Sequence, residues 1–213
     1  MRFASRQDAG RQLGTFLREH RIAADLVLGL PRGGVVVAAE VAREMNLPLD
    51  VLVVRKIGHP LQREFALGAL AEPDSVFFHD ETLREFPIAK MELDNIIAEE
   101  KGRLREYRQK FHLSAMPPIA GKNVLLVDDG LATGATAEAA AISVRKQNAG
   151  RCIIAAPVAS IEAVERLRRV ADDVQVLSAE ATFGAVGQFY REFFQTSDSE
   201  VIALLRDAAK PAA

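Results

Sequence analysis

Short runs of apolar, mostly β-branched residues alternate along the chain with longer segments of helical pattern. The runs are apolar throughout, without polar residues between, which is typical of parallel strands covered on both faces. The predicted strands are Leu26–Leu30, Val51–Val54, Val124–Val127, Cys152–Ala155 and Val174–Leu177. The helical patterns between them cover Val35–Met45, Ala135–Gln147 and Ile161–Val170.

This alternation predicts an α/β fold with a doubly wound, mostly parallel sheet of about five strands and right-handed crossovers. We expect a single domain over residues 1–213, with a core of about 22–177. The segments of about 1–21 and 178–213 do not join the alternation and are expected to form a small variable hood. The charged stretch Glu81–Lys110 favours a long exposed helix.

The amino-acid composition limits the classes of protein to which this chain can belong. Of the 213 residues 49% are hydrophobic and 26% charged, which is enough apolar content to bury a core. The net charge of −2, without a basic block, argues against a nucleic-acid or membrane partner. Cys152 is the only cysteine and lies in an apolar run, so we expect it to be buried and the compartment to be reducing. No signal peptide or membrane-spanning run is visible, and a cytoplasmic location is expected.

Ligands of such sheets bind beyond the carboxyl ends of the strands, and an unusual segment follows Val124–Val127. Residues 128–136 read DDGLATGAT, with a helix predicted from Ala135. Small residues let backbone N–H groups approach an anion, and the helix N-terminus adds partial positive charge. The preceding carboxylates, Asp128 and Asp129, suit a diol or a hydrated metal ion. Together these residues predict a site for a phosphorylated sugar.

Each half of this segment alone is more often a turn or a helix cap. Joined, they resemble the signature of type I phosphoribosyltransferases, which bind 5-phosphoribosyl-1-pyrophosphate (PRPP). The resemblance implies that Asp128 and Asp129 hold the ribose 2′- and 3′-hydroxyls and help to place Mg²⁺, through water and PRPP. It implies a 5′-phosphate site made of Ala132, Thr133, Gly134, Ala135 and Thr136.

A second candidate anion loop follows the first strand, where the sequence reads LPRGG. Paired glycines at a helix start and an arginine suit a phosphate, although a tight turn with a solvated arginine is an equal reading. Because it stands one crossover before the DDGLATGAT segment, the loop resembles the family's pyrophosphate loop. The resemblance implies pyrophosphate binding by Arg32, Gly33 and Gly34, and a cis peptide between Pro31 and Arg32.

The second strand ends in VRKIGHP, and its cations, Arg55 and Lys56, are expected to face the same crevice and to bind pyrophosphate. Residues 58–68 resemble the family's catalytic flexible loop, with a return strand from about Phe65. The loop residues singled out are Gly58, His59, Arg63 and Gly68.

The resemblance implies Mg²⁺-dependent transfer of the 5-phosphoribosyl group from PRPP to a nitrogenous base or amine, with release of pyrophosphate. The implied catalytic residues are Asp128, Asp129, Arg32 and Lys56, and the family pattern implies a homodimer. The acceptor stays open, because Ala132 stands where hypoxanthine–guanine transferases carry an aspartate. The N-terminal segment and the aromatic-rich residues 181–194 are the candidates for the acceptor-binding hood.

Two other functions compete with this one. The first is a non-catalytic protein of the same fold that binds PRPP or a nucleotide as a regulator. The second is a receiver domain, suggested by the run VLLVDD, but the later strands supply neither its phosphoacceptor aspartate nor its lysine. Glu72 is given no role, and His112 is interpreted as a surface or packing residue.

Overall fold

A computed structural model describes residues 2–60, 66–73, 75–78, 84, 88–112 and 117–209. Its main sheet has five parallel strands in the order β2-β1-β6-β7-β8. They are β1 (Leu26–Gly29), β2 (Leu49–Val51), β6 (Asn123–Val127), β7 (Arg151–Ser160) and β8 (Asp173–Glu180). The predicted doubly wound fold is confirmed, and β1 and β6 at its centre place two strand ends side by side.

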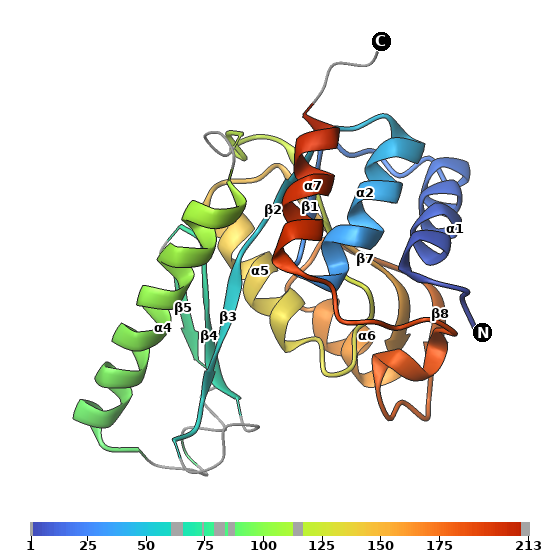
Figure 1. Ribbon diagram of the computed structural model, residues 1–213. Helices are drawn as coiled ribbons and strands as arrows, with labels where there is room; N and C mark the ends of the chain where they lie inside the picture. The colour runs from blue at the N-terminus through green and yellow to red at the C-terminus, as the bar shows by residue number, and fades with distance from the viewer. Residues whose placement is uncertain are drawn as a thin grey trace.

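Helices cover both faces of this sheet (Figure 1). Residues such as Val27 and Leu125 pack on α1 (Arg6–Glu19) and α2 (Gly33–Met45). Their neighbours in sequence pack instead on the helices of the other face, α5 (Ala135–Lys146) and α6 (Ile161–Leu167). Successive strand residues point to opposite faces, so burial on both sides explains why the runs are apolar throughout. Within the described ranges, no helix combines the length and the apolar character needed to cross a membrane.

A second, antiparallel sheet of three strands lies beside the main one with α4 (Lys90–Phe111) packed against it, on the left of Figure 1. Its strands are β3 (Val54–Gly58), β4 (Ala66–Ala71) and β5 (Ser75–Phe78). The expected return strand is present as β4. The predicted strand Val51–Val54 was wrong, since the chain changes sheets within it. Leu52 donates its N–H to Gly29 of β1 at 3.1 Å, whereas Val53 accepts from the N–H of Glu72 at 3.2 Å.

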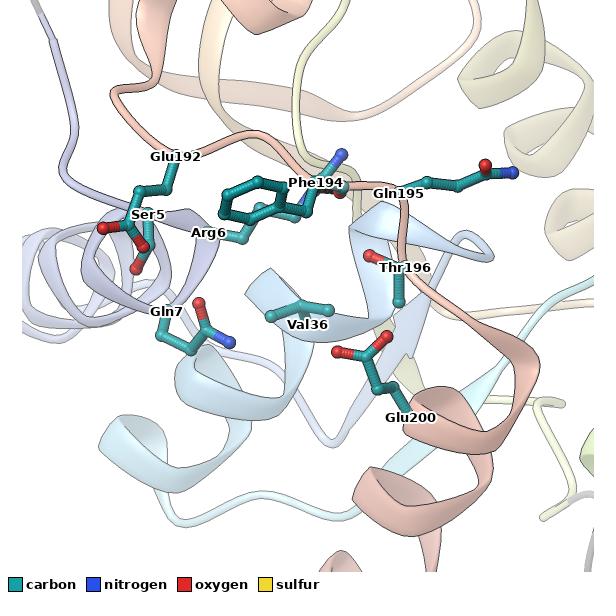
Figure 2. A pocket seen from close by; sticks show the side chains of 9 residues that line it. All are labelled: Ser5, Arg6, Gln7, Val36, Glu192, Phe194, Gln195, Thr196 and Glu200. Atoms are coloured by element: carbon teal, nitrogen blue, oxygen red, sulfur yellow. Dashed lines mark hydrogen bonds between the residues drawn. The ribbon is translucent and has the colours of Figure 1, made fainter.

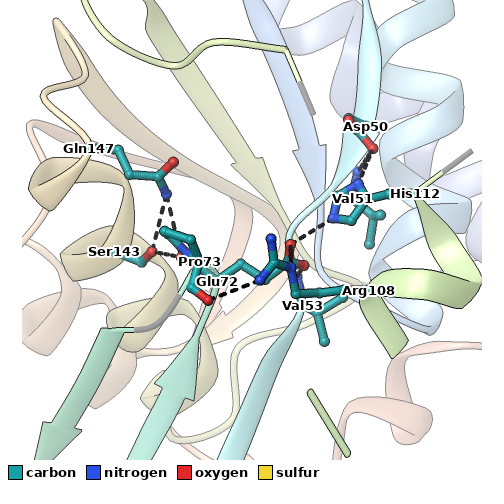
Figure 3. A network of polar contacts seen from close by, with 9 residues as sticks. All are labelled: Asp50, Val51, Val53, Glu72, Pro73, Arg108, His112, Ser143 and Gln147. Carbon is teal, nitrogen blue, oxygen red and sulfur yellow. Dashed lines mark hydrogen bonds and ion pairs between the residues drawn. The ribbon is translucent and has the colours of Figure 1, made fainter. Parts of the chain in front are cut away.

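A buried polar network joins the two sheets (Figure 3). Glu72, only 1% exposed, accepts hydrogen bonds from the Val53 N–H at 2.8 Å and from His112 Nε2 at 2.7 Å. Arg108 Nε lies 3.1 Å from the same carboxylate, and Asp50 Oδ1 lies 3.3 Å from His112 Nδ1. Burial lowers the pKa of His112, but hydrogen bonds and charges from Asp50 and Glu72 outweigh it and raise this pKa from 6.5 to about 9. His112, interpreted from the sequence as a surface or packing residue, is therefore a mostly buried, charged link between the two sheets.

The backbone carbonyl of Glu72 reaches a third element, α5. It accepts hydrogen bonds from the Ser143 hydroxyl and, at 3.4 Å, from Gln147 Nε2. Glu72, directly after β4, thus connects the antiparallel sheet to the link between β2 and β3, to α4 with its C-cap His112, and to α5.

The two terminal segments meet near the carboxyl ends of the main strands. Phe3 donates its N–H to Phe189 at 2.7 Å and accepts from the N–H of Arg191 at 2.9 Å. Phe189 ends a short 3₁₀ helix, η1 (Val186–Phe189), and α7 (Asp198–Ala208) follows beside α2. We name residues 190–196, between η1 and α7, the C-terminal strap. The N-terminal segment also adds a core layer, because Leu13 and Leu17 of α1 are fully buried against the sheet.

Candidate active site

The paired acids follow β6 directly and lie against the loop after β1. Asp128 continues the sheet through an N–H bond to Ala155 at 3.2 Å, and its Oδ1 accepts from the Asp129 N–H at 2.9 Å. A Cβ added to Gly33 would lie 2.0 Å from Asp129 Oδ2, and one added to Gly34 would lie 2.8 Å from Asp128 Oδ1. The glycines are therefore required by close packing, and the structure brings the predicted ribose and pyrophosphate elements together.

The acids form an electrostatically strained pair. Desolvation and then the neighbouring Asp129 charge raise the pKa of Asp128 well above its usual range. Desolvation also raises the pKa of Asp129, and the charge and hydrogen bond of Arg6 oppose this. Arg6 Nε lies 2.7 Å from Asp129 Oδ2, with side chains 11% and 15% exposed respectively. A buried pair of this kind favours a ligand that supplies positive charge or hydroxyl donors.

Sequence reasoning gave no role to Arg6, and no motif surrounds it. It also missed Tyr190, whose hydroxyl donates to the Asp129 carbonyl at 2.5 Å. Tyr190 was signalled only as part of the aromatic-rich segment 181–194, which the structure does place at this edge of the sheet.

The predicted 5′-phosphate loop is anchored to β7 and opens to solvent. Leu131 donates its N–H to Val158 at 2.9 Å, and the Ser160 hydroxyl donates to the carbonyl of Ala132 at 2.7 Å. Gly134 has a positive φ of 74° and caps α5. Ala132, Thr133 and Thr136 are exposed, and the N-terminal turn of α5 follows. This geometry suits an anion held by backbone N–H groups and a helix N-terminus.

We expect Gly134→Ala to lower the free energy of unfolding by about 1–2 kcal/mol, because an L-residue is strained at this φ. The added Cβ would also lie 3.2 Å from Leu167 Cγ. Gly102→Ala is the control, since Gly102 lies inside α4 with open space around it and should gain roughly 0.5–1 kcal/mol. Urea denaturation of both variants tests the pair, and equal effects would contradict the assignment.

Arg32 has the expected backbone but an unexpected partner. The Pro31–Arg32 peptide is cis, as predicted. The Arg32 guanidinium, however, lies 3.6 Å from Asp198 Oδ1 at the start of α7. Asp198 also pairs with Lys110 of α4. The predicted pyrophosphate loop therefore packs against the acid pair, while its arginine is turned to α7.

The basic residues of β3 were predicted to face one crevice, but their side chains point in different directions. Arg55 Nε lies 2.9 Å from Glu100 Oε2, and its guanidinium carbon lies 5.5 Å from the Tyr107 ring centroid, so this side chain faces α4. The exposed Lys56 side chain points to the other face, because neighbours in a strand alternate.

The segment between β3 and β4 is shorter than the flexible loop predicted for residues 58–68. Gly58 ends β3, and Gly68 lies within β4, where it pairs with Ile57. His59 lies half-buried just beyond β3. The prediction for Arg63 lies outside the described residues, as do all of 61–65.

The acids fit a magnesium ion bound together with a ligand. Carboxylates are hard oxygen donors, and Mg²⁺ in phosphate sites takes one or two of them plus water and substrate oxygens. The described parts of the chain hold no group of three or more potential metal-binding side chains.

A hollow of about 140 Å³ adjoins Arg6 (Figure 2). Its lining comes from the first turn of α1, from Val36 of α2, from the C-terminal strap and from Glu200 of α7. Within the strap, Thr196 contributes a hydroxyl group and is only 7% exposed. Phe194 contributes its ring and is 78% exposed.

Comparison with known proteins supports the family suggested by this geometry. The model of the phosphoribosyl transferase domain matches residues 6–193. Proteins from Mycobacterium tuberculosis strains CDC 1551 / Oshkosh and H37Rv, provisionally named phosphoribosyl transferases, are 43% identical over 204 residues. The alignment covers 95% of this chain and 46% of each relative, so the chain spans about half the length of these relatives.

Two crystal structures extend the comparison. TT1426 from Thermus thermophilus has a TM-score of 0.83 and 42% identity, with 99% of this chain and 100% of that chain covered. The purine phosphoribosyltransferase from Pyrococcus horikoshii has a TM-score of 0.50 and 17% identity, with 92% and 97% covered, which is a similarity of fold alone. Taken with the paired acids and the glycine loop that meets them, these matches show that the chain belongs to the phosphoribosyl transferase domain family.

Proposed function

We propose that this protein is a Mg²⁺-dependent phosphoribosyltransferase that transfers the 5-phosphoribosyl group of PRPP to a nitrogenous base or amine and releases pyrophosphate. One observation carries the proposal. The glycine loop at residues 33–34 packs directly on Asp128 and Asp129, although about a hundred positions of sequence separate them. The acids proposed for the ribose diol and the loop proposed for the pyrophosphate thus lie against each other, and the loop proposed for the 5′-phosphate follows the acids directly in sequence; this supports a match to the three parts of PRPP.

Each part of the ligand has a corresponding element. The loop of residues 132–136 is suited to the 5′-phosphate, Asp128 and Asp129 to the ribose hydroxyls, and the amides of Gly33 and Gly34 to the pyrophosphate. Bound Mg²⁺ would neutralise charge on the departing pyrophosphate. The chain itself would contribute orientation of the sugar and preorganised N–H donors for the leaving group. Lys56 is retained as a catalytic candidate, acting on the pyrophosphate.

The acceptor is proposed only as a class, a nitrogenous base or amine. Ala132 leaves its position without the aspartate of hypoxanthine–guanine transferases, which disfavours a 6-oxopurine. A homodimer and a cytoplasmic location remain predictions.

The test is a screen of free bases and small amines with PRPP and Mg²⁺, in which release of pyrophosphate is measured. Release that requires both an acceptor and Mg²⁺ is the expected result. PRPP binding without turnover across the screen would favour the regulatory alternative. Absence of PRPP binding would reject both the transferase and the regulatory function.

We expect Thr133→Val to weaken PRPP binding by about 0.5–1.5 kcal/mol, or roughly two- to tenfold, through loss of one hydroxyl donor to the 5′-phosphate. Because the metal lies at the acids, this loss should depend little on Mg²⁺. Calorimetric titration with and without Mg²⁺ measures it. Thr15→Val on α1 is the matched control, and an equal effect there would contradict a phosphate role.

A further inference from the structure

Arg6, on the first turn of α1, contacts both Asp129 and the C-terminal strap through its guanidinium group. Its Nε donates to Asp129 Oδ2 at 2.7 Å, and its Nη1 donates to the carbonyl of Phe194 at 2.7 Å. Its guanidinium carbon lies 3.8 Å from the centroid of the Phe193 ring. The side chain is only 11% exposed and that of Asp129 15%, so the ion pair is little screened by water, whereas the bond to Phe194 lies at the surface.

The Arg6–Asp129 pair is also packed against the pyrophosphate loop. A Cβ on Gly33 would lie 2.0 Å from Asp129 Oδ2 and 2.8 Å from Arg6 Nε. The ion pair therefore fills the space beside the glycine backbone. The N-terminal helix, the loop after β1 and the acid after β6 meet at this one contact.

The C-terminal strap is tied to the same acid from its other end. Tyr190 donates its hydroxyl to the Asp129 carbonyl at 2.5 Å, and its ring centroid lies 5.1 Å from that of Phe193. Arg6 contacts the next part of the strap, through the ring of Phe193 and the carbonyl of Phe194. The strap that lines the hollow in Figure 2 is thus joined to Asp129 both through Tyr190 and through Arg6, in addition to its backbone bonds to Phe3 and Ala4.

Such a contact has a specific physical effect. An aspartate carboxylate can rotate about its terminal torsion, which is broad. A charge-assisted bond from a buried, geometrically fixed guanidinium removes this freedom for Oδ2. Sites hold ligands most tightly when the contacting groups are already oriented.

We propose that Arg6 is a positioning residue for PRPP: it orients Asp129 towards the ribose and couples that acid to the C-terminal strap. The inference rests on the proposed function and adds to it a residue outside the family motifs quoted above. Arg6 acts through Asp129 and does not itself bond the reacting atoms.

Three variants test the assignment, with calorimetric titration of PRPP in the presence of Mg²⁺ and thermal melts of the free proteins. Arg6→Met keeps the aliphatic stem and should weaken PRPP binding roughly tenfold. Arg6→Lys keeps the charge but not the planar fork, and should recover part of this loss. Arg18→Met is the control, because it removes an exposed ion pair of the same helix, to Glu44 at 2.9 Å, and should leave binding unchanged.

A double-mutant cycle separates positioning from general support of the fold. In an Asp129→Asn background, Arg6→Met should cause little further loss of PRPP binding, because its effect passes through that acid. A loss of the same size in both backgrounds would overturn the assignment. Tighter binding by Arg6→Met would also overturn it, since Arg6 would then compete with the ribose.

Failure of this inference is distinguishable from failure of the proposed function. If the wild-type protein binds PRPP and Arg6→Met binds it equally well, only the role of Arg6 is rejected. If the wild-type protein does not bind PRPP, both are rejected.

Discussion

An Asp128→Asn variant is expected to bind PRPP about 1.5–3 kcal/mol more weakly than wild type, or roughly ten- to a hundredfold, because the charge-assisted hydrogen bond proposed to reach the ribose, beside the proposed metal, would be lost. The free protein should be at least as stable as wild type. Burial and the adjacent Asp129 charge already raise the pKa of Asp128, so removing the charge relieves an unfavourable interaction. Calorimetry with and without Mg²⁺, together with thermal melts, measures both effects.

Asp129→Asn should weaken PRPP binding by a similar amount but should behave differently in the melts. The substitution leaves the guanidinium of Arg6 nearly buried without its charge partner, which destabilises the folded state. Asp94→Asn, at an exposed position of α4, controls for the change in net charge. Unchanged PRPP binding in both variants, with a sharp fall in stability, would show that the acids serve only the fold.

The buried network around Glu72 predicts a loss of stability at alkaline pH. The pKa of His112 is about 9 in the folded protein and 6.5 in an ordinary environment. A group whose folded pKa is raised stabilises the fold fully below the unfolded value, so this contribution is present below about pH 6.5 and is lost as pH rises through about 9. We expect the free energy of unfolding to fall by on the order of 2–3 kcal/mol across this window.

His112→Gln should remove most of this pH dependence and should be less stable than wild type at pH 6 by a similar amount. The substitution removes the charged His112 ring and with it the contacts to Glu72 and Asp50. Urea denaturation at pH 6 and pH 9 provides the measurement. His20→Gln at the exposed end of α1 is the matched control and should keep the wild-type slope. A wild-type protein equally stable at both values would contradict the raised pKa.

The main sheet and the site loops could be predicted because each carries a local signal. Apolar runs marked the parallel strands, and the DDGLATGAT segment showed a strand end, an acid pair and a helix start within nine adjacent positions. The pairing of β1 with β6 then brings the two loops together, as the α/β rule for strand ends requires.

The wrong predictions concern positions where tertiary contacts, and not the local sequence, determine the strand pairing or the direction of a side chain. Residues 51–53 are buried where the chain crosses from one sheet to the other, and an apolar run does not reveal a change of strand partner. Arg55 was assigned to the ligand because it precedes a loop, but its strand continues to Gly58 and turns the side chain to α4. Arg6 carries no motif, and its role depends on a fold that brings residue 6 to residue 129.

The pairing of Phe3 with the segment around Phe189 and Arg191 has a practical consequence for handling the protein. Backbone bonds to residue 3 begin only three positions before Arg6, so an affinity tag or cleavage scar joined just ahead of Phe3 would sit beside the site. A bulky or charged extension there could alter the titrations described above without any substitution. Binding measurements are therefore best made on protein whose purification handle follows α7, because that helix runs away from the site after its capped N-terminus at Ser197.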